Sequence, residues 1–190
     1  MNLTSSGFPF GDIIQWVAPC QLPEPGQCQR QWLALPGSLT RHLRRHGTRF
    51  EVHVLGEAVL APLAGEWPEP CAQLWVREVL LCLDNRPWVY ARTLAPTALA
   101  QQQLLQLGKR PLGELLFTGD DFIAGDTEWA KAPENGHIRH LSNVLGQLSS
   151  QPIYGRRRHF HYHGQRLIVA EFFLPEAVKQ PPLAMTATTA

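Results

Sequence analysis

An arginine and a glutamate lie where the sequence otherwise predicts buried, apolar strand faces. Successive strand residues point to opposite faces of a sheet, so Arg77 shares a face with Trp75, Val79, Leu81 and Leu83. In the same way Glu171 shares a face with Leu167, Val169 and Phe173. Because an unpaired buried charge is very costly, each group needs a partner. Either the two pair with each other inside the sheet, or a strand is exposed at that point, or the charges face a ligand.

Three histidines alternate in the segment HFHYH, so His159, His161 and His163 would share one face of a strand. Three such imidazoles could bind a metal. No cysteine, and no acidic residue between residues 153 and 165, completes a ligand set, and three arginines precede the histidines. We therefore expect a polar strand that faces solvent, and no metal site.

The four cysteines match no catalytic or zinc-binding spacing. Cys20, Cys28, Cys71 and Cys82 form neither a CxxC motif nor a zinc pattern. Cys82 falls inside a predicted buried strand, where a thiol behaves as a small hydrophobic group. The GxSxG and HExxH motifs are also missing from the sequence.

Two predicted hairpins carry the candidate charges. Residues 74–83 and 88–94 are rich in Leu, Val and Trp, and Asp84-Asn85-Arg86-Pro87 between them supplies turn chemistry. Residues 153–163 and 166–174 form the second hairpin, around Gly164-Gln165. Two further strands are predicted, at residues 49–61 and 121–129.

Short helices are predicted between the strands. Residues 38–46 have Ser38 as N-cap and Gly47 after the end, which indicates a basic surface helix. Residues 97–107 form another, from Thr97 to Gly108. The break GKRPLG before a helix at residues 114–117 lacks the phosphate-loop pattern, although two short helices around such a break could form a movable cover. Further helices are expected at residues 13–17 and within an insertion at residues 131–152.

Paired strands with helices between them predict an α+β fold, in which a single antiparallel β-sheet has helices packed on one side and short helical flaps over a buried ligand site. We expect one domain over residues 1–180, followed by a disordered tail at residues 181–190.

Composition limits the class of protein. The chain has 190 residues, of which 17% are charged and 44% hydrophobic, and its formal net charge is +1. Such a balance argues against a general nucleic-acid binder, and no apolar run approaches the roughly 20 residues of a membrane span. The N-terminal residues lack the pattern of a secretory signal, and free thiols suit a reducing compartment. We expect a cytoplasmic monomer with a small-molecule substrate, no nucleic-acid partner and no membrane span.

Five blocks resemble the chorismate pyruvate-lyase family. They are WVREVLLC, PWVYARTLAP, LGKRPLGELLF, YGRRR and AEFFLP, and with their flanks they span residues 38–175 in order. The resemblance implies a single antiparallel sheet with helices, and neither a metal nor an organic cofactor. It implies removal of pyruvate from chorismate to leave 4-hydroxybenzoate, the first committed step of ubiquinone synthesis.

The resemblance also implies four ligand residues. Arg77 of the WxRE block would hold the ring carboxylate, and Leu112 of the PLG block would contribute its backbone N–H. Glu171 would face the ring hydroxyl, so Arg77 and Glu171 are the candidate catalytic residues. Leu39 would contribute a second backbone N–H, at a position where the family carries Met; a main-chain contact survives that change. The insertion and the tail are longer than is typical of the family.

The implied roles agree with the chemistry of the residues. Arg forms a bidentate, charge-assisted pair with a carboxylate, and chorismate is a dianion. Glu171 either accepts the proton that leaves the ring or only positions the substrate. Two other classes stay open: a non-catalytic binder of small aromatic carboxylic acids, and a nucleic-acid accessory protein that would use the arginines of residues 41–45 and 156–158.

Overall fold

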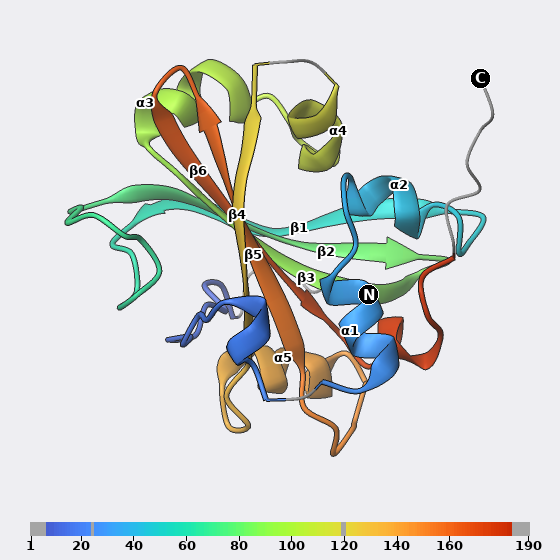
Figure 1. The fold of residues 1–190 in the computed structure, drawn as a ribbon. Coiled ribbons are helices and arrows are strands. Elements are labelled where there is room, and N and C mark those ends of the chain that lie inside the picture. Colours follow the sequence, from blue (N-terminus) through green and yellow to red (C-terminus); the bar gives the residue numbers. More distant parts are fainter. Residues whose placement is uncertain (1–6, 24, 119–120, 184–190) are drawn as a thin grey trace.

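The computed structural model describes residues 7–23, 25–118 and 121–183. Its centre is a six-stranded antiparallel sheet with the strand order β1-β2-β3-β6-β5-β4 (Figure 1). The strands are β1 (Phe50–Leu60), β2 (Leu74–Leu83), β3 (Arg86–Ala95), β4 (Ile123–Lys131), β5 (Tyr154–Tyr162) and β6 (Gln165–Phe173). The α+β fold with a single antiparallel sheet is confirmed.

The β2–β3 hairpin contributes β3, one of the two central strands of the sheet. Asp84 and Asn85 adopt φ values of 47° and 65°, the left-handed conformation that Asp and Asn tolerate and that tight hairpin turns require. All ten residues of β2 are buried, because both faces of the sheet are covered. This burial explains why the strand is almost continuously apolar in sequence.

The helices are short and connect or flank the strands. They are η1 (Pro19–Gln21), α1 (Gln27–Leu33), α2 (Leu39–Leu43), α3 (Thr97–Leu99), the π-helical turn η2 (Ala100–Leu104), α4 (Leu112–Phe117), α5 (His137–Val144) and η3 (Ala177–Lys179). Ser38 accepts a hydrogen bond from the Arg41 backbone, as an N-cap does. The N-cap of α3 is Pro96 rather than Thr97, and Gly108 has the expected positive φ of 52°. Within the described residues, no helix is long and apolar enough to cross a membrane.

The helix predicted at residues 13–17 is wrong. This segment is not helical, and Val17 exchanges two backbone hydrogen bonds with Trp129 of β4, at 3.0 and 2.9 Å. A tertiary strand-like pairing therefore replaces the local helix. The helix α1 went unpredicted in the Pro-rich segment that follows. Of the predicted tail, residues 184–190 lie outside the described residues.

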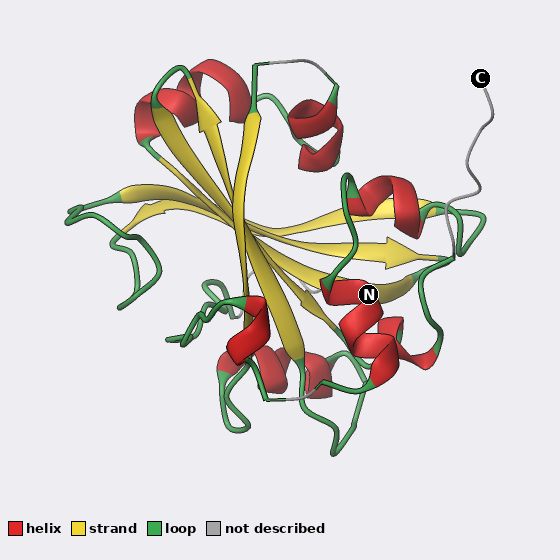
Figure 2. Cartoon of the chain, viewed as in Figure 1, coloured by secondary structure: helices red, strands yellow, loops and turns green. Residues whose placement is uncertain are grey.

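Helices cover both faces of the sheet, not one as the sequence suggested (Figure 2). We call the face that bears Arg77 and Glu171 the front face and the opposite one the back face. Residues of α1 and α2 join a core cluster on the front face, and residues of α3, η2 and α4 join a second. On the back face, Ile138 and Leu141 of α5 pack with Tyr90 and Phe172. The predicted insertion thus supplies a core helix.

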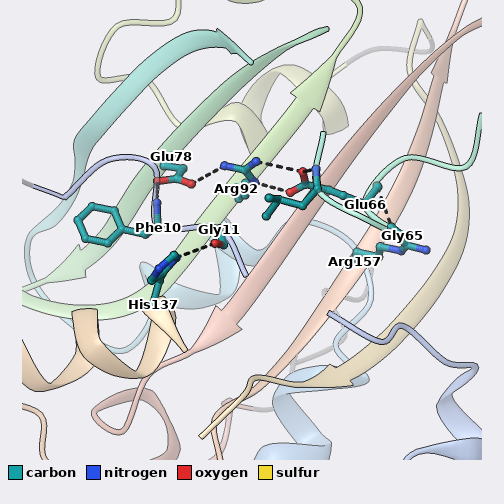
Figure 3. A network of polar contacts seen from close by, with 9 residues as sticks. Phe10, Gly11, Gly65, Glu66, Glu78, Arg92, His137 and Arg157 are labelled. Atoms are coloured by element: carbon teal, nitrogen blue, oxygen red, sulfur yellow. Dashed lines mark hydrogen bonds and ion pairs between the residues drawn. The ribbon is translucent and has the colours of Figure 1, made fainter. Parts of the chain in front are cut away.

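A buried charge network fixes loops to the back face (Figure 3). The side chain of Glu78 is fully buried and accepts hydrogen bonds from Arg92 and from the Phe10 backbone N–H. Arg92 also donates to Glu66, in the loop between β1 and β2. Burial opposes the charge on Arg92, but hydrogen bonding and attraction from Glu66 outweigh it and raise the pKa of Arg92.

We expect Arg92→Lys to lower the free energy of unfolding by about 1–2 kcal/mol, because one ammonium group cannot reproduce the branched contacts of the guanidinium. Urea denaturation measures this change. Affinity for ligands on the front face should stay that of the parent protein. An unchanged midpoint would mean that the network contributes nothing to stability.

Candidate active site

A cavity lies between the front face of the sheet and the short helices α2 and α4. The space there that atoms do not fill is about 640 Å³, part of which is open to solvent. Strands β2, β3, β6 and β5 provide its floor, and the first turns of α2 and α4 provide its cover. Its lining includes Leu39, Arg77, Leu112, Arg156, Arg158 and Glu171.

The strand register arranges the floor in two cross-strand rows. Residues opposite one another in adjacent strands point to the same face. One row runs Arg77, Thr93, Val169, Arg158, and the next runs Val79, Ala91, Glu171, Arg156. Every one of these eight residues lines the cavity. The charged groups therefore stand at defined positions on a floor of small or apolar side chains.

Arg77 is 3% exposed and forms part of the cavity wall. Its Nη1 donates to Glu57 of β1, and its Nη2 donates to the Gly108 carbonyl at 2.7 Å. Burial lowers the pKa of Arg77, and the attraction of Glu57 opposes that effect. A guanidinium has five N–H donors, so these two bonds leave donors for a ligand.

Arg77 and Glu171 do not form the ion pair that the sequence left possible. Glu171 pairs with Arg156 instead, with 2.7 Å between Arg156 Nε and Glu171 Oε2. Cross-strand register explains this choice, because Arg156 lies directly opposite Glu171 whereas Arg77 lies opposite Glu57 and Thr93.

Arg156 is a site residue that sequence reasoning missed. It is 2% exposed, and its Nη1 donates to the carbonyls of Leu35 and Leu33. The sequence predicts a polar, solvent-facing strand around residues 156–158, yet successive arginines of a strand point to opposite faces of the sheet. A signal was present, because Arg156 and Arg158 share a face with the aromatic Phe160.

The helices α2 and α4 bring the two residues predicted as backbone donors to the cavity. Leu39 is the first residue of α2 and Leu112 the first of α4, and the first N–H groups of a helix have no acceptor within it. An ion pair of 2.6 Å between Arg44 and Glu114 joins the two helices across the cover. All four residues predicted for ligand contact therefore line a single cavity.

Only two of the three alternating histidines, His159 and His161, share a face of β5. His163 lies in the turn after β5 with φ of 44°, and His159 faces the back of the sheet, where its Nε2 lies 2.9 Å from Glu128. Arg157 also pairs with Glu128. The prediction of a solvent-facing strand is wrong here, because Arg156, Arg157 and His159 are buried. The described residues hold no cluster of three or more His, Cys, Asp or Glu suited to a metal.

All four cysteines lie in the described part of the chain, and none of them lines the cavity. Cys82 is buried in β2, and burial raises the pKa of its thiol to about 12. It is a packing residue, as predicted.

The fold is similar to that of two solved proteins of low identity. PhnF from Mycobacterium smegmatis matches with a TM-score of 0.54 and 13% identity, over 82% of this chain and 71% of that one. The C-terminal domain of the histidine utilization repressor from Pseudomonas syringae matches at 0.52 and 12%, over 73% and 99%. At such identities the likeness concerns the fold alone.

Comparison of the sequence with known proteins identifies relatives of much higher identity. A probable chorismate pyruvate-lyase from Shewanella loihica is 50% identical over 181 residues, 93% of this chain and 96% of the relative. A probable chorismate pyruvate-lyase from Idiomarina loihiensis is 38% identical and covers 88% of each chain. The model of the family described as chorismate lyase matches residues 12–181.

These matches define an enzyme of the lyase class. The chain belongs to the chorismate lyase family.

Proposed function

We propose that this enzyme removes pyruvate from chorismate to give 4-hydroxybenzoate, and so supplies the aromatic precursor of ubiquinone. The observation that carries the proposal is the cavity, where the four residues expected to contact the ligand meet. Three guanidinium groups, those of Arg77, Arg156 and Arg158, line the cavity, and guanidinium groups form strong charge-assisted pairs with the carboxylates of an anionic ligand.

Arg77 and the Leu112 N–H hold the ring carboxylate of chorismate in this proposal. Glu57 and Gly108 fix the Arg77 guanidinium in position before the ligand arrives. A preorganised donor of this kind needs no reorganisation when the ligand binds.

Glu171 accepts a hydrogen bond from the ring hydroxyl, and the Leu39 N–H donates one to the hydroxyl oxygen, at the end of the ring opposite the carboxylate. Arg156 orients the carboxylate through Oε2. Among the described residues no hydrogen bond engages Glu171 Oε1, which leaves this oxygen able to accept a hydrogen bond from the hydroxyl or the proton of the carbon that bears it.

The reaction breaks one C–H bond and one C–O bond. The proton leaves the ring carbon that bears the hydroxyl, its electron pair completes the aromatic ring, and the ether C–O bond breaks. The enolpyruvyl fragment leaves and is protonated on its methylene carbon to give pyruvate. Either Glu171 carries that proton as a general base, or the proton moves directly within chorismate while Glu171 holds the hydroxyl.

The test is to incubate the purified protein with chorismate and to quantify both products. We expect pyruvate and 4-hydroxybenzoate in equal amounts, at a rate that EDTA leaves unchanged. Pyruvate without 4-hydroxybenzoate would contradict the proposal, as would activity lost in EDTA and restored by zinc.

A further inference from the structure

Three arginines line the cavity, and two of them already have a carboxylate. Arg77 pairs with Glu57, and Arg156 pairs with Glu171. Among the described residues no carboxylate lies within ion-pair distance of Arg158. The cavity thus holds one cation whose charge the surrounding side chains leave uncompensated.

The contacts of Arg158 are long and go to neutral oxygens. Its Nε lies 3.2 Å from Thr127 Oγ1, and its two terminal nitrogens lie 3.3 and 3.5 Å from the carbonyls of Gly37 and Leu35. Charge-assisted bonds from a guanidinium to a carboxylate are shorter, about 2.7–2.9 Å, and roughly twice as strong. A carboxylate in the cavity would therefore compete well with these contacts.

The surroundings of Arg158 also favour an anion. Burial and the neighbouring Arg156 lower the pKa of Arg158, and Glu171 opposes them. A bound negative charge would remove the cost that burial and repulsion impose on the guanidinium.

Arg158 stands at the opposite end of a cross-strand row from Arg77. The two are separated by Thr93 and Val169, so three strand spacings of about 4.8 Å separate their backbones by about 14 Å. Both arginines line the cavity, and the two residues between them in the row are small and uncharged. This geometry suits a ligand with two carboxylates.

We propose that Arg158 binds the second carboxylate of the substrate, the one on the departing three-carbon group. The inference rests on the proposed function, because chorismate has two carboxylates whereas 4-hydroxybenzoate has one. Arg158 then selects the dianionic substrate over the monoanionic product. The contact is lost when pyruvate leaves, so Arg158 adds nothing to the affinity for the aromatic product.

The test compares Arg158→Gln and Arg158→Lys with the parent enzyme. Three quantities are measured: kcat and KM for chorismate, the Kd of 4-hydroxybenzoate, and the Kd of 3-(carboxymethoxy)-4-hydroxybenzoate, an inert dianion with a second carboxylate on the ether arm. For Arg158→Gln we expect KM and the dianion Kd to rise about tenfold or more. The Kd of 4-hydroxybenzoate should change less than about twofold. Arg158→Lys should show a smaller rise in the same two quantities, because it keeps the charge and loses the fork.

Arg166→Gln is the matched control. It removes the same charge from the adjacent strand β6, where Arg166 pairs with Glu69 at 3.0 Å and lies outside the cavity lining. It should leave all three quantities near those of the parent.

Equal weakening of the dianion and of 4-hydroxybenzoate would overturn the inference, since it would mark Arg158 as a structural anchor of the loop at Gly37. Unchanged values in both Arg158 variants would overturn it too. If Arg158→Gln fails to fold, Arg158→Lys provides the test. A rise in its dianion Kd with an unchanged Kd for 4-hydroxybenzoate would support the inference, and an equal rise in both would overturn it. Failure of the proposed function is separate: the parent protein would then form no 4-hydroxybenzoate, whereas the two Kd values would still report on Arg158.

Discussion

Replacement of Glu171 by Gln is expected to lower kcat for chorismate by roughly 10²-fold or more, the usual contribution of a general base. Gln keeps the size of the side chain: its amide oxygen can accept from Arg156 Nε, and its NH2 group can donate to the oxygen of the ring hydroxyl. It removes the charge and the proton acceptor. Affinity for 4-hydroxybenzoate should change much less, because Arg77 still holds the carboxylate. The measurement is kcat, product Kd and melting temperature on the same preparation.

Glu171→Ala separates catalysis from positioning. If Glu171 only orients the hydroxyl, the Gln variant should keep most of kcat and the Ala variant should lose it. The Ala variant also leaves Arg156 buried without its carboxylate, so its melting temperature should fall further than that of the Gln variant. Normal turnover in both variants would remove Glu171 from the mechanism.

Arg77→Lys is expected to weaken binding of both chorismate and 4-hydroxybenzoate by about 2 kcal/mol or more, which is about 30-fold. Lys keeps the charge but presents a single ammonium group, so it cannot bridge Glu57, Gly108 and a carboxylate at once. Isothermal titration with 4-hydroxybenzoate measures the effect. Product affinity equal to that of the parent, in a folded variant, would refute the role of Arg77 as the carboxylate anchor.

Glu57→Gln is the control for this prediction. It removes the carboxylate partner of Arg77 but leaves the guanidinium fork in the cavity wall. If Arg77 binds the ligand, Glu57→Gln should retain product affinity within several-fold of the parent. If Arg77 serves only the ion pair, both substitutions should lower stability alike and neither should act specifically on binding.

The strands could be predicted because their signals are local. Alternation in Phe50, Val52 and Val54 identified β1, and the apolar run of residues 74–83 matched β2 to the residue. The absence of a helix at residues 13–17 could not be predicted, because Val17 pairs with Trp129, more than one hundred residues away. Likewise the position of α5 on the back face depends on tertiary packing against Tyr90 and Phe172.

The site was predictable only in part, and one turn explains why. The alternation of strand residues identified Arg77 and Glu171 as charged groups on otherwise apolar strand faces, and both line the cavity. Their partners depend on register, however. With the turn at Gly164-Gln165, as predicted, Glu171 would lie opposite Arg158. The actual turn at His163-Gly164, with φ of 44° and 78°, pairs it with Arg156. A one-residue change in the turn therefore exchanges two arginines.

A crystal structure of the complex with 4-hydroxybenzoate would show directly whether Arg77 and Glu171 contact the two ends of the ligand. We expect the ring in the front-face cavity, with its carboxylate on Arg77 and the Leu112 N–H and its hydroxyl on Glu171 and the Leu39 N–H. A ligand bound elsewhere, or one bound in the cavity with its hydroxyl at Arg77 and its carboxylate at Glu171, would contradict this expectation.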